Sequence, residues 1–286
     1  MAKRPPAGCG LDVTKRVLYH PYMHGPKGFH ASRRLRKCTH CGQVVTQTIG
    51  SLVCPHCQFA HEGNDTFLRL FKSLHLRAGR RSAKTHGGAH GVREELAIPR
   101  QRWWACAPTF KILHDSTEPT LLRLLPPSWV KDWSQEHHEV TLWNDSMLQF
   151  RSLDDPDRGR GPGLNGVWLD EAAFINKRGW DILSPSLSEN LGIVISTTSP
   201  NGFDWTYDEF FVPALIDLVP GYWAARFHTL DNPLFRESEP LRREVEEKRL
   251  KWHDKPDLFR QEFEGEDVNA TDSVYGATAI DAQVIM

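Results

Sequence analysis

The chain has 286 residues, of which 40% are hydrophobic and 25% charged, as is usual for a soluble globular protein. This length suits one sizeable α/β domain with a small accessory unit. The formal net charge of −1 excludes a protein whose bulk charge attracts nucleic acid. No apolar run approaches the roughly 20 residues of a membrane-spanning helix, and no apolar segment follows the amino terminus as in a signal peptide. We therefore expect a protein of the reducing cytoplasm, whose six cysteines are metal ligands or buried thiols.

Positive charge is concentrated near the amino terminus. Residues 27–37 read KGFHASRRLRK and end a stretch, 1–37, that is rich in proline, glycine and histidine. We expect 1–37 to be a loosely ordered basic arm. Such a segment either meets phosphate groups of a partner or is a solvated surface, and its composition is compatible with both.

Two CxxC pairs follow this arm, Cys38/Cys41 and Cys54/Cys57. A CxxC turn presents two thiolates to one ion, and zinc takes four such ligands tetrahedrally. We therefore predict a zinc ribbon over residues 38–62, with a short hairpin within 42–53. Three histidines offer substitute ligands, although four cysteines are the simpler set: His40, His56 and His61. The ribbon is either a staple for a segment too small to hold a core or a docking element for DNA or a protein.

The rest of the chain alternates between helical and extended patterns. A helix, or a helix and then a strand, is predicted over 64–76. Further helices are predicted directly after Lys84-Thr85 and over 110–125, 205–217 and 238–252. Strands are predicted over 102–107, 139–143, 147–151, 166–170, 192–197 and 221–228, with a hairpin at 144–145. This alternation implies a mostly parallel central sheet flanked by helices, with ligands at the carboxyl ends of its strands. Five residues are expected in the core: Trp103, Trp104, Cys106, Trp168 and Trp180.

Residues 78–85, AGRRSAKT, have the pattern of a phosphate-binding loop. Lys84 suits the β- and γ-phosphates, Thr85 can place its hydroxyl on Mg²⁺, and the loop N–H groups can cradle the phosphates. The predicted nucleotide-binding residues are Ala78, Gly79, Arg80, Arg81, Ser82, Ala83, Lys84 and Thr85. The usual Gly-Lys pair is Ala83-Lys84 here, and a Cβ that resists a positive φ costs about 1 kcal/mol. A basic turn without nucleotide is the alternative.

Residues 166–171, GVWLDE, form an apolar strand that ends in two carboxylates. Asp170 is expected to hold Mg²⁺, and Glu171 to orient or deprotonate the attacking water. The alternative is a carboxylate pair that only caps the following helix. Because a phosphate loop lies upstream, the combination indicates hydrolysis of ATP.

Arginines and hydroxyl groups complete the predicted site. Arg80 and Arg81 can reach the γ-phosphate within the chain, whereas Arg158 and Arg160 lie on a loop that suits a finger inserted into a neighbouring subunit. Each is otherwise a solvated charge. The residues after the strand at 192–197 can sense the γ-phosphate and pass its loss to another segment: Thr197, Thr198 and Asn201.

Taken in order, these stretches resemble the ATPase part of the large terminase subunit of tailed bacteriophages, the motor that packages DNA into proheads. The resemblance covers about residues 65–275 and is far more specific than a lone nucleotide loop. Six stretches carry it: AGRRSAKT (78–85), APTF (107–110), RSLDDPD (151–157), GVWLDEAAF (166–174), STTSPNG (196–202) and FRQEFEGE (259–266).

The resemblance implies roles for residues and partners. It assigns Lys84 and Thr85 to nucleotide and magnesium, Asp170 to the metal and Glu171 to the catalytic water. Residues 197–199 match the family's coupling motif, so the expected coupling set is Thr197, Thr198, Ser199 and Asn201. It also implies a ring of subunits on a portal protein, a small terminase subunit as partner, and translocation of double-stranded DNA in the host cytoplasm.

The large subunit of this family usually continues into an RNase H-like nuclease domain, whereas this chain ends soon after Tyr275. We therefore expect an ATPase domain over 63–275, a tail over 276–286, and no nuclease activity from this chain. The nuclease is then a separate subunit or absent. The ribbon is not part of the common family core. A different class of function stays open: a zinc-ribbon docking subunit that keeps the ATPase fold with weak or no turnover. A P-loop helicase is disfavoured because no further helicase-like motifs follow.

Overall fold

The computed structural model describes residues 35–46, 53–60 and 67–268. Most of the expected basic arm and the whole expected tail lie outside these ranges, as do 47–52 and 61–66. No helix within the described ranges is long and apolar enough to cross a membrane.

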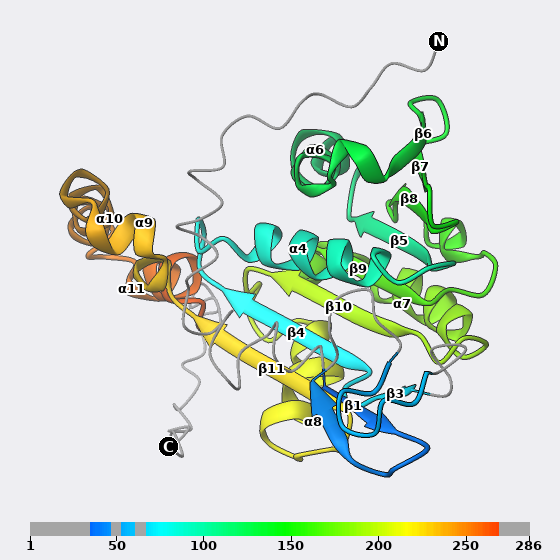
Figure 1. Ribbon diagram of the computed structural model, residues 1–286. Helices are drawn as coiled ribbons and strands as arrows, with labels where there is room; N and C mark the ends of the chain where they lie inside the picture. Colours follow the sequence, from blue (N-terminus) through cyan, green and yellow to red (C-terminus); the bar gives the residue numbers. More distant parts are fainter. Residues whose placement is uncertain (1–34, 47–52, 61–66, 269–286) are drawn as a thin grey trace.

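An eight-stranded sheet forms the centre of the protein (Figure 1), in the order β11-β4-β10-β9-β5-β8-β7-β6. The strands from β11 to β8 are parallel, and β7 and β6 continue the sheet in antiparallel fashion. The strands are β4 (Ser73–Ala78), β5 (Arg102–Ala107), β6 (Val130–Ser134), β7 (Glu139–Leu142), β8 (Met147–Ser152), β9 (Gly166–Asp170), β10 (Ile193–Thr198) and β11 (Tyr222–Phe227). The predicted α/β fold with a mostly parallel sheet is confirmed.

Helices cover both faces of the sheet. Among the described residues, the α-helices are α4 (Lys84–Leu96), α5 (Phe110–Ile112), α6 (Glu118–Leu124), α7 (Lys177–Leu183), α8 (Val212–Leu215), α9 (Pro233–Glu237), α10 (Glu239–Lys251) and α11 (Pro256–Phe259). Three segments of the described chain are π-helical turns: Leu113–Thr117, Tyr207–Phe211 and Arg260–Glu264. Short 3₁₀ turns occupy Pro127–Trp129, Pro156–Gly159, Ala172–Phe174, Ser184–Leu187 and Thr229–Asp231. Helices α9 to α11 lie beyond the end of β4 and β11 to which both strands point (Figure 1).

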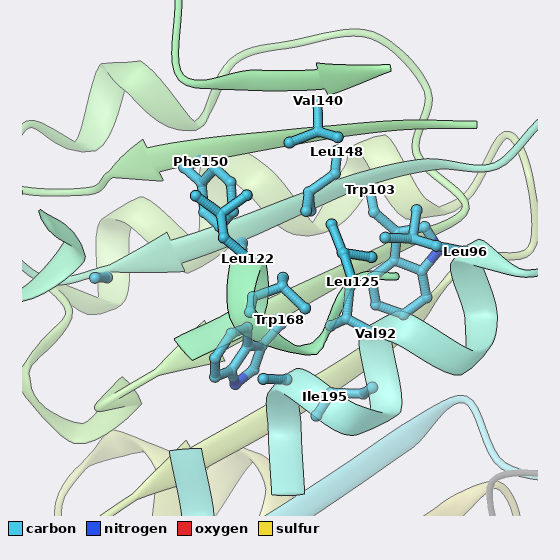
Figure 2. Packing of buried hydrophobic residues seen from close by; sticks show 14 of the residues in the cluster. Val92, Leu96, Trp103, Leu122, Leu125, Val140, Leu148, Phe150, Trp168 and Ile195 are labelled. Atoms are coloured by element: carbon cyan, nitrogen blue, oxygen red, sulfur yellow. The ribbon is translucent and has the colours of Figure 1, made fainter. Parts of the chain in front are cut away.

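Alternation along the buried strands divides the core into two layers. Trp103 packs with Val92 of α4 and Leu122 of α6 on one face (Figure 2). Trp104, the next residue, packs on the other face with Trp180 of α7. Successive side chains of a strand point to opposite faces, so this tryptophan pair fills both layers. The predicted core positions of the tryptophans and of Cys106 are confirmed.

In the segment before the phosphate loop, the strand of the helix-then-strand alternative is confirmed, whereas the helix is not. Residues 67–76 are not helical but form β3 (Phe67–Arg69) and most of β4. All six residues of β4 are buried, because helices cover both faces of the sheet there. Its sequence, SLHLRA, alternates polar and apolar residues as a strand does, and its polar residues are buried as well. Strand β6 is also absent from the predicted elements. The helix expected over 110–125 is confirmed but contains the π-helical turn Leu113–Thr117.

The cysteine-rich segment forms a second, three-stranded antiparallel sheet in the order β2-β1-β3. Strands β1 (Leu35–Cys38) and β2 (Val44–Thr46) form a hairpin that encloses the first CxxC pair. The hairpin expected within 42–53 lies partly outside the described residues. Arg36, on β1, is buried and ion-paired with Glu95 near the end of α4 at 3.3 Å. The ribbon therefore contacts the helix that follows the phosphate loop.

Candidate active site

The phosphate loop joins β4 to α4 at the carboxyl edge of the parallel sheet. Lys84 and Thr85 are the first residues of α4, so the loop N–H groups lie at a helix amino terminus, where anions are favoured. Arg81 and Ala83 have φ values of 56° and 73°. Ala83 therefore occupies the left-handed region that favours glycine, and the strain expected from the sequence at this position is present.

We predict that Ala83→Gly raises the free energy of unfolding by about 1 kcal/mol, because glycine adopts this φ without a Cβ penalty. Urea denaturation measures the difference. The matched control is Ala89→Gly within α4, where helical backbone makes the same exchange destabilising by about 1 kcal/mol. Equal destabilisation by both substitutions would contradict the prediction.

The loop is held in place by the carboxyl-terminal part of the domain. Thr229 Oγ1 donates to the Arg80 carbonyl at 2.6 Å, and Asn232 Nδ2 donates to the Arg81 carbonyl at 2.9 Å. The Arg80 backbone N–H donates to the Glu262 carbonyl at 2.6 Å, and the two side chains form an ion pair. A Cβ on Gly79 would come within 2.3 Å of the Phe263 carbonyl oxygen. The loop thus has close backbone contacts that need glycine at 79.

Asp170 ends β9 and is completely buried. Its carboxylate accepts hydrogen bonds from three hydroxyl groups: Thr85 at 3.2 Å, Thr117 at 2.9 Å and Thr197 at 2.8 Å. Burial, together with the nearby negative charge of Glu171, raises the pKa of Asp170 to about 6. Carboxylate and hydroxyl oxygens are the donors that Mg²⁺ prefers, so Asp170 and Thr85 fit the metal assigned to them.

Glu171 has its backbone in the left-handed region, with φ 50° and ψ 46°. Its carboxylate is 3.2 Å from Lys84 Nζ and accepts a hydrogen bond from the Ser199 backbone N–H at 3.3 Å. A left-handed non-glycine residue at the end of a strand is uncommon and often marks a functional site. The turn directs the Glu171 carboxylate toward Lys84 of the phosphate loop. The Asp170 carboxylate is instead directed toward the hydroxyl groups of Thr117 and Thr197.

The predicted coupling residues are distributed along the end of β10. Thr197 Oγ1 accepts from Trp168 Nε1 at 2.9 Å, in addition to its bond to Asp170. Thr198 Oγ1 accepts from the Ala173 N–H at 3.1 Å. Ser199 contacts Glu171, as described above. The Asn201 backbone N–H donates to Asp204 at 3.1 Å and not to Asp170 or Glu171.

The predicted arginines are not gathered around Lys84. The Arg80 side chain is engaged with Glu262, and Arg81 is exposed. Arg158 and Arg160 are exposed and paired with Asp154 and Asp157 of their own loop. The structure therefore brings together lysine, hydroxyl and carboxylate groups, and leaves the role of each arginine as a prediction.

Two features of the loop fit a phosphate ligand. Within the described chain, the buried Ser82 Oγ has no hydrogen-bond partner. Lys84 is also buried, and its ammonium group lies 3.2 Å from a carboxylate oxygen of Glu171. A buried hydroxyl and a buried ammonium at a helix amino terminus form a donor set for phosphate oxygens.

Sequence reasoning did not find Thr117, which lies 53 residues from Asp170 on the π-helical turn Leu113–Thr117. It also did not assign Thr229 and Asn232 to the phosphate loop. Only the match of residues 259–266 to the family's segment pointed to the region that contains Glu262.

The four predicted zinc ligands form one compact cluster. The sulfurs of Cys38, Cys41, Cys54 and Cys57 all lie within 4.8 Å of one another. The Cys38–Cys57 and Cys41–Cys54 sulfur pairs are 3.8 and 3.9 Å apart. A tetrahedron with Zn–S bonds of about 2.3 Å has edges of roughly 3.8 Å, so the cluster fits zinc without rearrangement.

We predict that Cys54→Ser loses the zinc that the wild-type chain retains, and that its melting temperature falls because metal binding stabilises this small unit. Metal analysis after dialysis and a thermal melt measure the two effects. Cys106→Ala, in the core of the main sheet, is the control that should keep zinc. Full zinc retention by Cys54→Ser would contradict the assignment.

These features define the class of protein. A Lys-Thr loop after β4, a carboxylate pair at the end of β9 and the intervening strand β10 form the site of a P-loop NTPase fold.

The chain is 28% identical over 227 residues to the proteins named "Terminase, large subunit" of Thermus virus P23-45 and Thermus phage G20c. The match covers 69% of this chain and 46% of each relative, so the chain spans about half the length of those relatives. The large terminase ATPase domain of Thermus phage P74-26 has a TM-score of 0.53 at 24% identity, over 69% of this chain and 89% of that one.

The large terminase of another thermophilic bacteriophage, solved in complex with ADP, has a TM-score of 0.55 at 17% identity, over 69% of this chain and 48% of that one. No family model matches the chain. The chain therefore has homologues among the large terminase subunits of phages, and its fold is that of their ATPase domain. This confirms the resemblance inferred from the sequence.

Proposed function

We propose that this chain is the ATP-hydrolysing motor subunit of a viral DNA-packaging terminase, which couples Mg-ATP hydrolysis to translocation of double-stranded DNA into a prohead. The observation that carries the proposal is the meeting of Lys84, Thr85, Asp170 and Glu171 in one site. The names of the relatives, and the ADP bound to one of the similar terminase structures, support nucleotide as the ligand.

Each group has a defined part in the reaction. Lys84 and the loop N–H groups bind the phosphates, and Lys84 exchanges its contact with Glu171 for phosphate oxygens. Thr85 and Asp170 would hold magnesium, which would neutralise charge on the phosphates. Glu171, freed from Lys84, accepts a proton from the water that attacks the γ-phosphorus, and the bond to the β–γ bridging oxygen of ADP breaks.

A cavity of about 480 Å³ adjoins the phosphate loop and suits the nucleoside. Arg80 and Arg81 line it on the loop side, and Phe235, Trp252 and Phe263 line it on the side of α9 to α11. Aromatic side chains bind bases by stacking. We place the adenine base in this cavity.

We expect Trp252→Ala to weaken ATP binding roughly tenfold, the effect of losing one stacked base. Binding of inorganic triphosphate, which has no base, should stay unchanged. Isothermal titration of both ligands separates the two contributions. Trp143→Ala, an exposed tryptophan on the far edge of the sheet, is the control. An equal loss for both ligands would place the base elsewhere.

Steady-state ATP hydrolysis with and without double-stranded DNA tests the proposed function. Turnover that DNA stimulates supports a translocating motor. The second candidate is a zinc-ribbon docking subunit with weak or no turnover, which the strained Ala83 favours. Absence of turnover in a folded, zinc-loaded chain, even in the presence of DNA and portal protein, would support that candidate.

The remaining assignments are proposals that rest on the family. The active form is a ring of subunits on a portal protein, working with a small terminase subunit in the host cytoplasm. Arg80, Arg81 and Arg160 are the candidates for the arginine that stabilises the transferred phosphoryl group, and the exposed side chain of Arg160 suits a finger that acts in trans. Within this chain we keep 1–37 as a basic arm, 38–62 as a zinc-binding ribbon, 63–275 as the ATPase domain and 276–286 as a tail.

A further inference from the structure

Arg77 is a buried cation of the main domain that lies outside the phosphate site. Arg77 is on β4, two residues before Gly79, and it is completely buried. Its guanidinium donates to Asp204 at 2.7 Å, to Thr206 Oγ1 at 2.7 Å and to the Gly202 carbonyl at 3.0 Å. It also forms an ion pair with Asp267. A buried arginine is costly unless its donors are satisfied, so this arrangement is built around Arg77.

The partners of Arg77 come from two functional segments. Gly202, Asp204 and Thr206 lie on the loop that follows the coupling residues at the end of β10. Asp267 belongs to the segment 265–268, which overlaps the end of FRQEFEGE and is the last described part of the chain. Asp267 also pairs with Arg226 of β11. Two arginines and two aspartates thus form a neutral cluster where β4 and β11 meet these two segments.

The same two segments also meet the active site. Ser199, at the start of the loop, donates to Glu171. Gly265 lies against the start of the phosphate loop, since a Cβ on it would be 2.9 Å from the Gly79 nitrogen. Arg77 therefore joins the far end of the coupling loop to a segment that supports the phosphate loop.

We infer that Arg77 is a positioning residue that ties the coupling loop to the segment 265–268, so that the two move together when the contacts of Glu171 change. The inference rests on the proposed function, because the movement starts when nucleotide binds at Lys84 and Glu171. The output is the position of the segment 265–268.

Hydrogen exchange with and without magnesium and the slowly hydrolysed analogue ATPγS tests this inference. In the wild-type protein, the analogue should slow exchange in peptides covering both 199–206 and 265–268 by about fivefold or more. In Asp267→Asn, the loop 199–206 should still be protected, whereas 265–268 should lose its response. If the role of Asp267 were purely structural, exchange would be faster both with and without the analogue, and the ratio of the two exchange rates would stay as in the wild type.

Arg226→Gln, which leaves the bond from Arg77 to Asp267 intact, is the control and should respond like the wild type. A retained response of 265–268 in Asp267→Asn would overturn the inference.

A second measurement does not depend on nucleotide. If Arg77 links Asp204 and Asp267, the shift in urea midpoint of the double variant Asp204→Asn/Asp267→Asn should be smaller than the sum of the two single shifts. Additive shifts would overturn the link. If the wild-type protein binds no ATPγS, the proposed function fails. The comparison of the double variant with the two single variants then decides alone whether Arg77 joins the two segments.

Discussion

Glu171→Gln should lower the ATP turnover number by roughly 10²- to 10⁴-fold, the usual contribution of a general base. Glutamine has the shape of glutamate and can accept the Ser199 N–H bond, so the loop geometry should persist. It cannot take a proton from water. It also removes the ion pair to Lys84, so ATP affinity should be unchanged or higher. Single-turnover hydrolysis and equilibrium binding of ATP give the two quantities separately.

The control for this substitution is Glu136→Gln, which removes an exposed carboxylate from the turn between β6 and β7. It should hydrolyse ATP like the wild-type protein. Turnover by Glu171→Gln within a few fold of the wild type would remove Glu171 from its catalytic role. Loss of nucleotide binding in the same variant would instead indicate that Glu171 maintains the loop.

Asp170→Asn should abolish magnesium-dependent nucleotide binding and yet stabilise the metal-free protein above pH 6. Burial raises the pKa of Asp170 from 3.8 to about 6, so the folded state binds a proton more tightly than the unfolded state. The stability contributed by this group is therefore complete below pH 3.8 and is lost as pH rises through 6. Asparagine stays neutral and escapes this loss, which is on the order of 3 kcal/mol.

Urea unfolding in the presence of a chelator, across a pH series that brackets both pKa values, measures this effect. Other carboxylates titrate in both proteins, so the quantity to follow is the stability of Asp170→Asn minus that of the wild type. It should grow as pH rises from 3.8 to about 6 and then level off, since the titration lies between the two pKa values. A difference that does not change with pH would mean that Asp170 is not held protonated by its surroundings. Adding magnesium and nucleotide should reverse the order of stability, because only the wild type binds them.

The parts of the site that could be predicted from sequence are local. AGRRSAKT and GVWLDE each place their functional groups within a few residues, next to a strand or helix end that the pattern itself reveals. The zinc ligands were predictable for the same reason, since each CxxC pair is a complete half-site. The left-handed Ala83 follows from a single departure within a known loop pattern.

The parts that could not be predicted depend on long-range packing. Thr117 reaches Asp170 only because a π-helical turn rotates it toward β9, and no local pattern marks that rotation. In the sequence, nothing distinguishes Arg77 from the exposed arginines of the basic loop that follows it. Its burial depends on Asp204 and Asp267, which are distant in sequence. The helix expected at the start of 64–76 is wrong for Phe67–Arg69, which form β3 by pairing with β1 of the cysteine-rich segment, a contact that no local pattern marks.

The three π-helical turns have a consequence for the evolution of the chain. Each is equivalent to one residue inserted into an α-helix, and deleting one residue would restore the regular helix while turning the following side chains by about 100°. Each turn carries a residue used by the rest of the molecule: Thr117 on Asp170, Tyr207 beside Arg77, and Glu262 on Arg80. In alignments of related chains, a gap of one residue at any of these places should therefore mark a protein that has lost this site.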